Sequence, residues 1–345
     1  MVASGVARIL HVLTGCTAVG KTELALRWAE ANGAEIVSCD SLLFYRGMDI
    51  GTAKPTAAER ARVPHHLIDL CEITGQMDVT HYVTKTRSVV EDLFVRGKTV
   101  LVTGGSGFYL KSFFAPVADA VEVPAVLREE GRTRLEREGL VPLLAELRGL
   151  NPGGLGSLDA QNPRRVLRAL ERCRASGRTL AELQADFAAQ PAPFADCEVR
   201  LCELAREKDD LEKRIELRVA GMLESGLVEE VRGLLAAGLR QNPSAANAIG
   251  YRETIEHIEG RLTAGELAGL MAKNTRALVK KQRTWFKTQL PAHPCVDARS
   301  ADLGGLFVPL TGGGFTAKAQ EYDHVRGDDE RNQEGGQQAE RQDGE

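Results

Sequence analysis

Residues 7–22 read ARILHVLTGCTAVGKT, a strand-like stretch that runs straight into a glycine-rich loop. Residues 15–22, GCTAVGKT, match the phosphate-loop pattern G-x-x-x-x-G-K-[ST] in full. The pattern carries this meaning only between a strand and a helix. Residues 7–14 predict a buried strand, and residues from about 21 to 31 predict a helix. The stretch therefore predicts an α/β fold with a phosphate-binding loop after its first strand.

Each part of this loop has a role in binding a phosphate chain. Its glycines permit backbone angles that point several N–H groups at one phosphate, and the helix that follows presents its positive end. Lys21 adds a positive charge, and the Thr22 hydroxyl is a ligand for Mg²⁺. The residues expected to bind diphosphate or nucleotide are Gly15, Cys16, Thr17, Ala18, Val19, Gly20, Lys21 and Thr22. The motif indicates a bound phosphate chain but does not identify the group that is transferred.

Two further strands are predicted outward from the loop. Residues 34–39 form a second strand that ends at Asp40, and residues 98–103 form a third that runs into the loop GGSGF. Strands that alternate with helices predict a parallel sheet wrapped by helices, here of the P-loop NTPase type. Ligands of such sheets bind beyond the carboxyl ends of the strands. We therefore expect Gly15, Asp40 and Gly104 to meet at one site.

The residues alone leave the roles of two polar side chains open. Asp40 fits a helix N-cap, a Mg²⁺ ligand or a general base, and the first two roles are the more common ones at a strand end. Ser106, in TGGSGFYL, is a possible hydrogen-bond donor, although the loop could equally be a tight turn. The spacing of Gly104 and Gly107 suggests a dinucleotide fingerprint, but this loop lies about 100 residues from the first strand, where that fingerprint usually occurs.

The pattern changes along the chain and predicts four parts. Residues 1–115 form the first part of the P-loop core. Residues 116–195 are rich in charged residues in a pattern typical of helices, and they form a helical insertion domain. Residues 196–316 complete the core with a strand at 198–205 and long helices near 208–237 and 263–290. Residues 317–345 are expected to be a disordered acidic tail, since they contain almost no apolar residues.

Composition excludes several classes of protein. The net charge of −4 owes most to the tail, because residues 318–345 carry a net charge of −5 and leave the rest of the chain near neutral. No apolar run approaches the roughly 20 residues that span a bilayer. The seven cysteines are scattered without a C-x-x-C pair, as expected of reduced thiols in a cytoplasmic protein.

Positive charge gathers in two stretches. Residues 161–178 hold six arginines and one acid, and residues 271–290 hold six basic residues and no acid. Such runs are often solvated helix faces, but the missing counter-charges in the second run favour contact with nucleic-acid phosphates.

The segment SCDSLLFYRGMDIGTAKPT, residues 38–56, is the most specific string in the chain. Together with the two glycine loops it resembles the tRNA dimethylallyltransferase (tRNA isopentenyltransferase) family. NPRRVLRALE (162–171), EKRIELRVAGMLESGLVEEV (212–231), AIGYRE (248–253) and TRALVKKQRTWFK (275–287) extend the resemblance from about residue 8 to about 290. The family joins dimethylallyl diphosphate to the exocyclic amine of the adenosine 3′ of the anticodon and releases diphosphate.

The resemblance implies a role for each matching residue. Asp40 would be the catalytic base, Ser106 a hydroxyl of the active-site loop, Arg128 an arginine near the reaction centre and Arg218 an arginine on the diphosphate. Mg²⁺ is the implied cofactor, with Thr22 as its ligand, and the implied partners are dimethylallyl diphosphate and the tRNA anticodon stem–loop. No membrane is implied, and a monomer is expected.

The residues implied in tRNA binding come from four segments of the chain. They are Asp40, Ser41, Leu42, Leu43, Arg164, Arg165, Val166, Leu167, Arg168, Asn247, Ala248, Ile249, Gly250, Tyr251, Arg252, Lys280, Lys281, Gln282, Arg283, Thr284, Trp285, Phe286 and Lys287. The chain departs from the family pattern at Cys16, Val19, Phe44 and Asn247. The first two leave the phosphate loop intact, because its backbone N–H groups do the binding.

Three other functions remain open from the residues. A small-molecule kinase would use the same loop to hold ATP, and a relative could prenylate free adenine nucleotides. The third is an RNA-binding nucleotide switch without catalysis. The basic helices favour a polymer substrate, and the set of Lys21, Thr22, Asp40 and Ser106 counts against a mere switch.

Overall fold

The computed structural model describes residues 8–119 and 121–307. The chain divides into two compact units, one of residues 1–114 with 194–345 and the other of residues 115–193. The sequence placed the helical insertion at 116–195. The predicted acidic tail, 317–345, lies outside the described residues.

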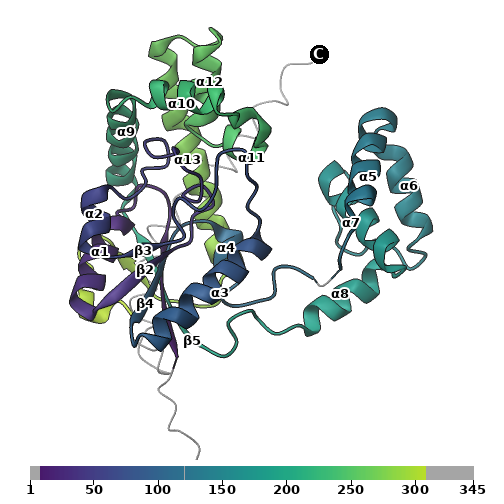
Figure 1. Ribbon diagram of the computed structural model, residues 1–345, viewed down its shortest axis with the longest axis horizontal. Coiled ribbons are helices and arrows are strands. Elements are labelled where there is room, and N and C mark those ends of the chain that lie inside the picture. Colours follow the sequence, from purple (N-terminus) through teal and green to yellow (C-terminus); the bar gives the residue numbers. More distant parts are fainter. Residues whose placement is uncertain (1–7, 120, 308–345) are drawn as a thin grey trace, which may run out of the picture. The chain divides into compact units, whose positions relative to one another are not determined.

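The larger unit is built on a six-stranded sheet in which all neighbouring strands are parallel (Figure 1). The strand order is β3-β2-β4-β1-β5-β6. The strands are β1 Ile9–Gly15, β2 Ala34–Ser38, β3 His65–His66, β4 Thr99–Thr103, β5 Glu198–Ala205 and β6 Cys295–Asp297. The predicted α/β class with a parallel sheet wrapped by helices is confirmed.

Alternation along the strands sends side chains to two separate cores. On one face, Leu13, Ile36 and Leu101 pack with residues of α1 (Lys21–Asn32), α9 (Lys208–Glu224) and α10 (Leu227–Ala236). On the other, Val12 and Val102 pack with α3 (Val79–Val95) and α4 (Gly107–Lys111). Because successive strand residues point to opposite faces, each core draws on alternate positions. The sheet is therefore covered on both faces, as parallel sheets require.

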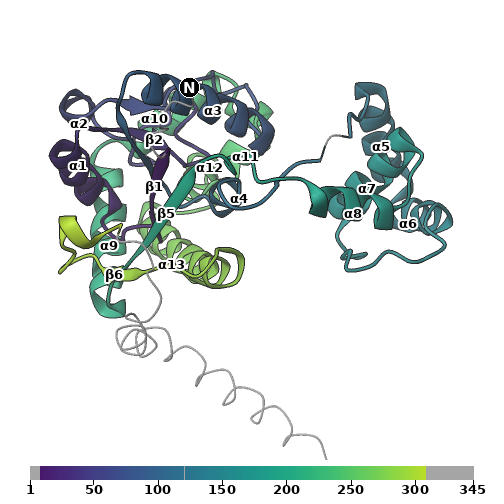
Figure 2. The same cartoon turned by 90° about the horizontal axis from the view of Figure 1, so that it is seen from below.

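The remaining elements of this unit surround the sheet. Gly226, with φ +95°, separates α9 from α10 within the region 208–237 where long helices were expected. The longest helix, α13, spans Ala264–Gln289 and packs against α9. Figure 2 shows β6 beside β5. The others are α2 Ala57–Arg62, η1 Leu239–Gln241, α11 Pro243–Ala246, α12 Tyr251–Ile258 and η2 Leu303–Gly305.

The smaller unit consists of helices in its described part. They are α5 Ala125–Glu138, α6 Leu140–Gly149, α7 Pro163–Ser176 and α8 Leu180–Ala189. Its core is built from Leu143, Leu147, Val166 and Leu170, which come from α6 and α7, with Leu183 of α8. In neither unit does the described chain contain a helix both long and apolar enough to cross a membrane.

Candidate active site

The phosphate loop joins β1 to α1 in the predicted place. The side-chain nitrogen of Lys21 donates hydrogen bonds to the carbonyl oxygens of Gly15 and Cys16, at 2.7 and 2.9 Å. Gly20 has φ +107°, in the region that favours glycine, and it caps the twelve-residue helix α1. The loop thus ends at the N-terminus of α1, the positive end of the helix, where a bound anion is stabilised.

The ends of β2 and β4 meet beside this loop. A Cβ at Gly104 would lie 2.0 Å from the carbonyl oxygen of Cys39, so only glycine fits this close approach. The Gly104 carbonyl accepts a hydrogen bond from the Thr14 hydroxyl at 2.9 Å. Gly15, Asp40 and Gly104 are therefore brought together at the carboxyl ends of three neighbouring strands, as the sequence predicted.

A small polar cavity of about 300 Å³ opens where these segments meet. Lys21 and Thr22 line it from the phosphate loop, and Asp40 lines it from the end of β2. Arg214 and Arg218, one turn apart on α9, also line it. Three cations and the carboxylates of Glu23, Asp40 and Glu59 thus line one cavity, and its cations can bind a polyanion such as diphosphate.

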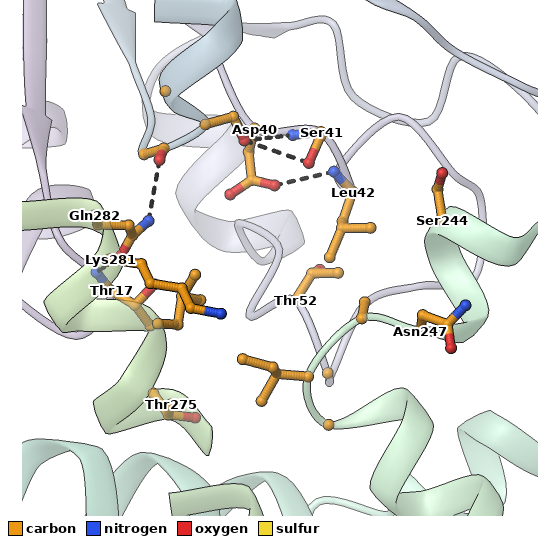
Figure 3. Close-up of a pocket in the computed structure, with 18 of the residues that line it drawn as sticks. Thr17, Asp40, Ser41, Leu42, Thr52, Ser244, Asn247, Thr275, Lys281 and Gln282 are labelled. Carbon is orange, nitrogen blue, oxygen red and sulfur yellow. Dashed lines mark hydrogen bonds between the residues drawn. The ribbon is translucent and has the colours of Figure 1, made fainter. Parts of the chain in front are cut away.

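A larger cavity of about 630 Å³ adjoins the first and is shown in Figure 3. Thr17, Asp40, Thr52 and Arg218 line both cavities and so mark their junction. Its apolar lining includes Leu42, Phe108, Tyr109, Val219, Met222, Ile249, Met271, Leu278 and Trp285. In Figure 3, Lys281 and Gln282 of α13 face the space from one side, and Ser244 and Asn247 from another.

Asp40 stands at this junction with one oxygen engaged. Its Oδ1 accepts a hydrogen bond from the Leu42 amide at 3.0 Å, which orients the carboxylate. Ser106 lies alongside: its hydroxyl oxygen accepts from the Ser41 amide at 3.0 Å and donates to the Ser41 hydroxyl at 3.3 Å. Ser106 therefore joins the β4 loop to the segment that carries Asp40.

The arginines of α9 hold the loops around the cavity. Arg214 donates from Nε to the carbonyl oxygen of Ala18 at 2.8 Å, and Arg218 donates from Nη2 to that of Thr52 at 3.2 Å. Arg206, which precedes the helix, donates from Nε to the Val19 carbonyl at 3.0 Å. Sequence reasoning missed Arg214. The four-residue spacing of the arginines in RIELR, which places both on one helix face, is the signal that could have found it.

Burial lowers the pKa of two of these cations. Desolvation lowers the pKa of Lys21 to about 8, and the nearby Arg218 guanidinium lowers it further, whereas Asp40 acts in the opposite direction. Burial also lowers the pKa of Arg218. Charged groups held in a desolvated site without enough counter-charge gain most from an incoming anion.

Three of the side chains predicted to bind tRNA are buried in the protein core. Val166, Tyr251 and Phe286 are each 0 % exposed. Tyr251 donates its hydroxyl to Glu230 at 2.7 Å, and Phe286 packs in the core that contains α3 and α4. Val166 and Tyr251 therefore offer no side-chain surface to RNA, whereas Phe286 borders the larger cavity. Phe44 is also fully buried and packs near Tyr82 and Tyr109.

Two further residues of α13 turn toward loops of the protein. Gln282 binds the Thr17 amide and the Gly105 carbonyl. Arg283 donates to the Arg206 carbonyl at 3.0 Å. Lys281, Thr284 and Lys287 are exposed on the same helix. The exposed side chains are open to an RNA ligand, whereas Gln282 could meet one only in the larger cavity, which it also lines.

The arginine-rich stretch on α7 is partly neutralised by neighbouring helices. Arg174 binds Glu130 and Glu146, Arg172 binds Asp119, and Arg178 binds Asp186. Carboxylates from outside residues 161–178 thus add to Glu171, the single acid within that stretch, in neutralising its arginines. In the part of the chain the structure describes, Arg164 and Arg165 are exposed and form no ion pair. Arg128 is exposed on α5 of the same unit.

The chain is similar to one family of known proteins. The IPP transferase family model matches residues 43–289. A tRNA dimethylallyltransferase of Opitutus terrae is 64 % identical over 301 residues, which cover 86 % of this chain and 96 % of that protein. A full-length tRNA isopentenylpyrophosphate transferase of Bacillus halodurans has a solved structure with a TM-score of 0.60 at 28 % identity, covering 95 % of this chain and 98 % of that one. The structure of a eukaryotic dimethylallyltransferase acting on tRNA shares the fold, with a TM-score of 0.73 at 23 % identity over 92 % of this chain and 80 % of that one.

Proposed function

This chain belongs to the IPP transferase family, and we propose that it transfers a dimethylallyl group from dimethylallyl diphosphate to tRNA. The acceptor is the exocyclic amine of the adenosine 3′ of the anticodon, and diphosphate is released. The observation that carries the proposal is the junction of two unlike cavities at Asp40: a small cationic one suits diphosphate, and a larger, mostly apolar one suits a prenyl chain and a purine base.

The phosphate-loop side stabilises the leaving group. As the carbon–oxygen bond of the prenyl diphosphate breaks, negative charge grows on the diphosphate oxygens. Lys21, Arg214, Arg218 and the N-terminus of α1 border this space, so positive groups stand near the place where the charge develops. Arg214 also fixes the Ala18 carbonyl, and so it shapes the loop.

The Asp40 side activates the acceptor. The amine nitrogen forms a bond to the prenyl carbon as the carbon–oxygen bond breaks, and the nitrogen then gives up a proton. Asp40 is the carboxylate at the junction of the two cavities, and it accepts this proton. A base stacked in the anticodon loop has to leave its stack to reach this depth. The Leu42 amide holds the Asp40 carboxylate in place.

Mg²⁺ fits the smaller cavity through its chemistry. The Thr22 hydroxyl lines that cavity at the start of α1, beside Asp40 and the place for the diphosphate. A magnesium ion there would be held by Thr22 and by diphosphate oxygens, and it would neutralise part of the leaving group's charge. Within the described residues there is no cluster of three or more His, Cys, Asp or Glu side chains that could hold a metal. The ion would thus arrive with its substrate.

We propose that RNA phosphates contact the exposed lysines of α13 in the larger unit and, separately, the exposed arginines at the start of α7 in the smaller unit. Lys281 both lines the larger cavity and is open to solvent, so it can place an RNA phosphate near the acceptor base. The protein is proposed to act as a monomer in the cytoplasm.

One incubation tests the proposal. The protein, Mg²⁺ and unmodified tRNA are mixed with dimethylallyl diphosphate in one arm and ATP in another, and free AMP replaces tRNA in a third. Nucleosides are then analysed by mass. We expect a prenylated adenosine only in the first arm. Phosphoryl transfer from ATP would instead indicate a kinase, and prenylated AMP without modified tRNA would indicate a nucleotide prenyltransferase.

A further inference from the structure

Two buried hydroxyl groups at the ends of neighbouring strands lack partners. In the described part of the chain, Ser38 Oγ and Thr103 Oγ1 accept and donate no hydrogen bond and are shielded from solvent. Ser38 as a residue is only 2 % exposed. A buried hydroxyl without a partner is unfavourable, and most buried polar groups avoid this state. Two such groups side by side therefore call for an explanation.

Both hydroxyls face the phosphate loop. Ser38 and Thr103 are paired in the register of β2 and β4. Two positions earlier on the same strands, Ile36 and Leu101 pack in the core with α1. Since strand residues two apart share a face, Ser38 and Thr103 point to the face that α1 covers, and both line the small cavity with Thr22.

We propose that Ser38 and Thr103 bind the water ligands of a Mg²⁺ ion that enters the small cavity with the diphosphate. This inference rests on the proposed function, which places a diphosphate beside Lys21. Mg²⁺ keeps several of its waters when it binds proteins and phosphates. The ends of β2 and β4, where these hydroxyls lie, form part of the wall of this cavity.

The residue types suit this role. A hydroxyl can accept a hydrogen bond from a metal-bound water, which is a strong donor. It orients the ion without adding a negative charge, so the ion can leave together with diphosphate after transfer. Asp40 is then the carboxylate at this edge and remains available for proton transfer. Ser38 and Thr103 thus act as positioning residues for the ion.

Three variants and a control test this inference: Ser38→Ala, Thr103→Val, the double variant, and Thr86→Val. Thr86 also has a buried, unpartnered hydroxyl, but it lies on α3, against the other face of the sheet. Each protein is freed of metal with a chelator. Binding of inorganic pyrophosphate is then measured by calorimetry at a series of Mg²⁺ concentrations and without Mg²⁺.

Mg²⁺ is expected to raise the affinity for pyrophosphate, and the quantity compared is the Mg²⁺ concentration that gives half of this gain. For the double variant, we expect that concentration to rise about tenfold. This is the lower end of the cost of removing a residue that hydrogen-bonds to the ligands of a metal. Affinity without Mg²⁺ should not change, and Thr86→Val should behave as wild type. Thermal unfolding without ligand provides a second readout. The variants should unfold at the same temperature as wild type or higher, because they remove unpartnered hydroxyls.

Other outcomes overturn the inference. Equal weakening with and without Mg²⁺ would mean that the hydroxyls bind phosphate directly, and an unchanged Mg²⁺ dependence would mean that they bind neither. If the double variant does not fold, the single variants decide by the same criteria. If wild-type protein binds pyrophosphate with Mg²⁺ but transfers no prenyl group, the proposed function is refuted. The inference about Ser38 and Thr103 is then still decided by the Mg²⁺ dependence of pyrophosphate binding in the variants.

Discussion

The side chain of Gln282 accepts a hydrogen bond from the main-chain amide of Thr17, with 2.9 Å between the amide nitrogen and Oε1. Its Nε2 donates to the Gly105 carbonyl at 3.0 Å. One residue of α13 therefore joins the phosphate loop to the loop that follows β4. Lys281 lies next to it on the same helix and faces the larger cavity (Figure 3). The helix that offers lysines to RNA thus also fixes the loop that binds diphosphate.

We predict that Gln282→Glu lowers kcat and raises KM for dimethylallyl diphosphate. A glutamate can still accept from the Thr17 amide but cannot donate to Gly105, and it brings a negative charge toward the leaving group. Losing one bond to the partly buried Gly105 carbonyl and adding this repulsion should reduce kcat/KM by at least about tenfold. Steady-state kinetics with both substrates measures the effect.

Gln289→Glu is the matched control, because it makes the same chemical change on the exposed end of α13. Its kinetics should resemble wild type. Equal effects of the two variants would show that negative charge on the helix, and not the bridge between loops, is responsible.

We predict that Asp40→Asn reduces turnover by about 100- to 10,000-fold, the usual cost of losing a general base. Asparagine keeps the shape and can still accept from the Leu42 amide, so binding of tRNA and of pyrophosphate should be preserved. Single-turnover rates and binding curves separate the two effects. Asp92→Asn, on the exposed side of α3, serves as control. Near-normal turnover of Asp40→Asn would remove this residue from the mechanism.

The pKa of Lys21 gives a pH dependence whose sign is fixed. Burial lowers this pKa to about 8, so in the free enzyme the ammonium is charged below pH 8 and loses its proton above it. Diphosphate binds the charged form. Affinity for pyrophosphate should therefore be constant from pH 6.5 to 7.5 and then fall by up to about tenfold per pH unit above 8.

Lys21→Arg provides the comparison for this pH dependence. An arginine stays protonated over the whole range, so the loss of affinity above pH 8 should disappear, whatever its affinity at neutral pH. Calorimetric titrations at several pH values measure both proteins. If pyrophosphate affinity falls with pH in parallel for wild type and Lys21→Arg, the fall is caused by titration of the ligand or of a group other than Lys21.

The sequence predicts the central strands and fails at the edges for a physical reason. β1, β2, β4 and β5 are five to eight residues long and largely buried, and their bounds differ from the prediction by at most two residues. β3 is only His65–His66 and β6 only Cys295–Asp297, and both are half-buried. Segments this short carry no repeating pattern, and their pairing depends on neighbours far along the chain.

The candidate site divides in the same way. Lys21 and Thr22 belong to a local motif whose meaning is carried by adjacent residues, and Asp40 follows a recognisable strand. Arg214 is different, since its partner Ala18 lies 196 residues earlier in the chain. Basic residues on α13 could be predicted from their charge, but the pattern could not show that Gln282 and Arg283 point inward. Long-range contacts of this kind are decided by the fold.

Glu230 illustrates the same limit and leads to a further prediction. Its carboxylate accepts hydrogen bonds from the backbone amides of Asp49, Ile50 and Gly51, at 3.0, 2.6 and 3.2 Å. It also accepts from the Tyr251 hydroxyl. Thr52 directly follows Gly51 in the chain. Its carbonyl oxygen accepts the hydrogen bond from Arg218, and the residue lines both cavities. Glu230 thus anchors the loop on which the position of Arg218 depends.

We predict that Glu230→Gln lowers the free energy of unfolding by about 2 kcal/mol and reduces kcat/KM for dimethylallyl diphosphate more than for tRNA. A glutamine places an NH₂ group against backbone donors, so at least one charge-assisted hydrogen bond is lost. The loop then loosens and Arg218 loses its carbonyl partner. Chemical denaturation and steady-state kinetics give the two quantities.

Glu229→Gln is the matched control, because Glu229 is the preceding residue on α10, has an exposed side chain, and pairs only with Arg232 at 3.3 Å among the contacts seen. It should change neither stability nor kinetics by a measurable amount, as expected of an exposed ion pair. A purely structural role for Glu230 would lower stability while leaving KM for dimethylallyl diphosphate unchanged at a temperature where the variant is fully folded. A rise in that KM under the same conditions is therefore the result that assigns Glu230 to the positioning of Arg218.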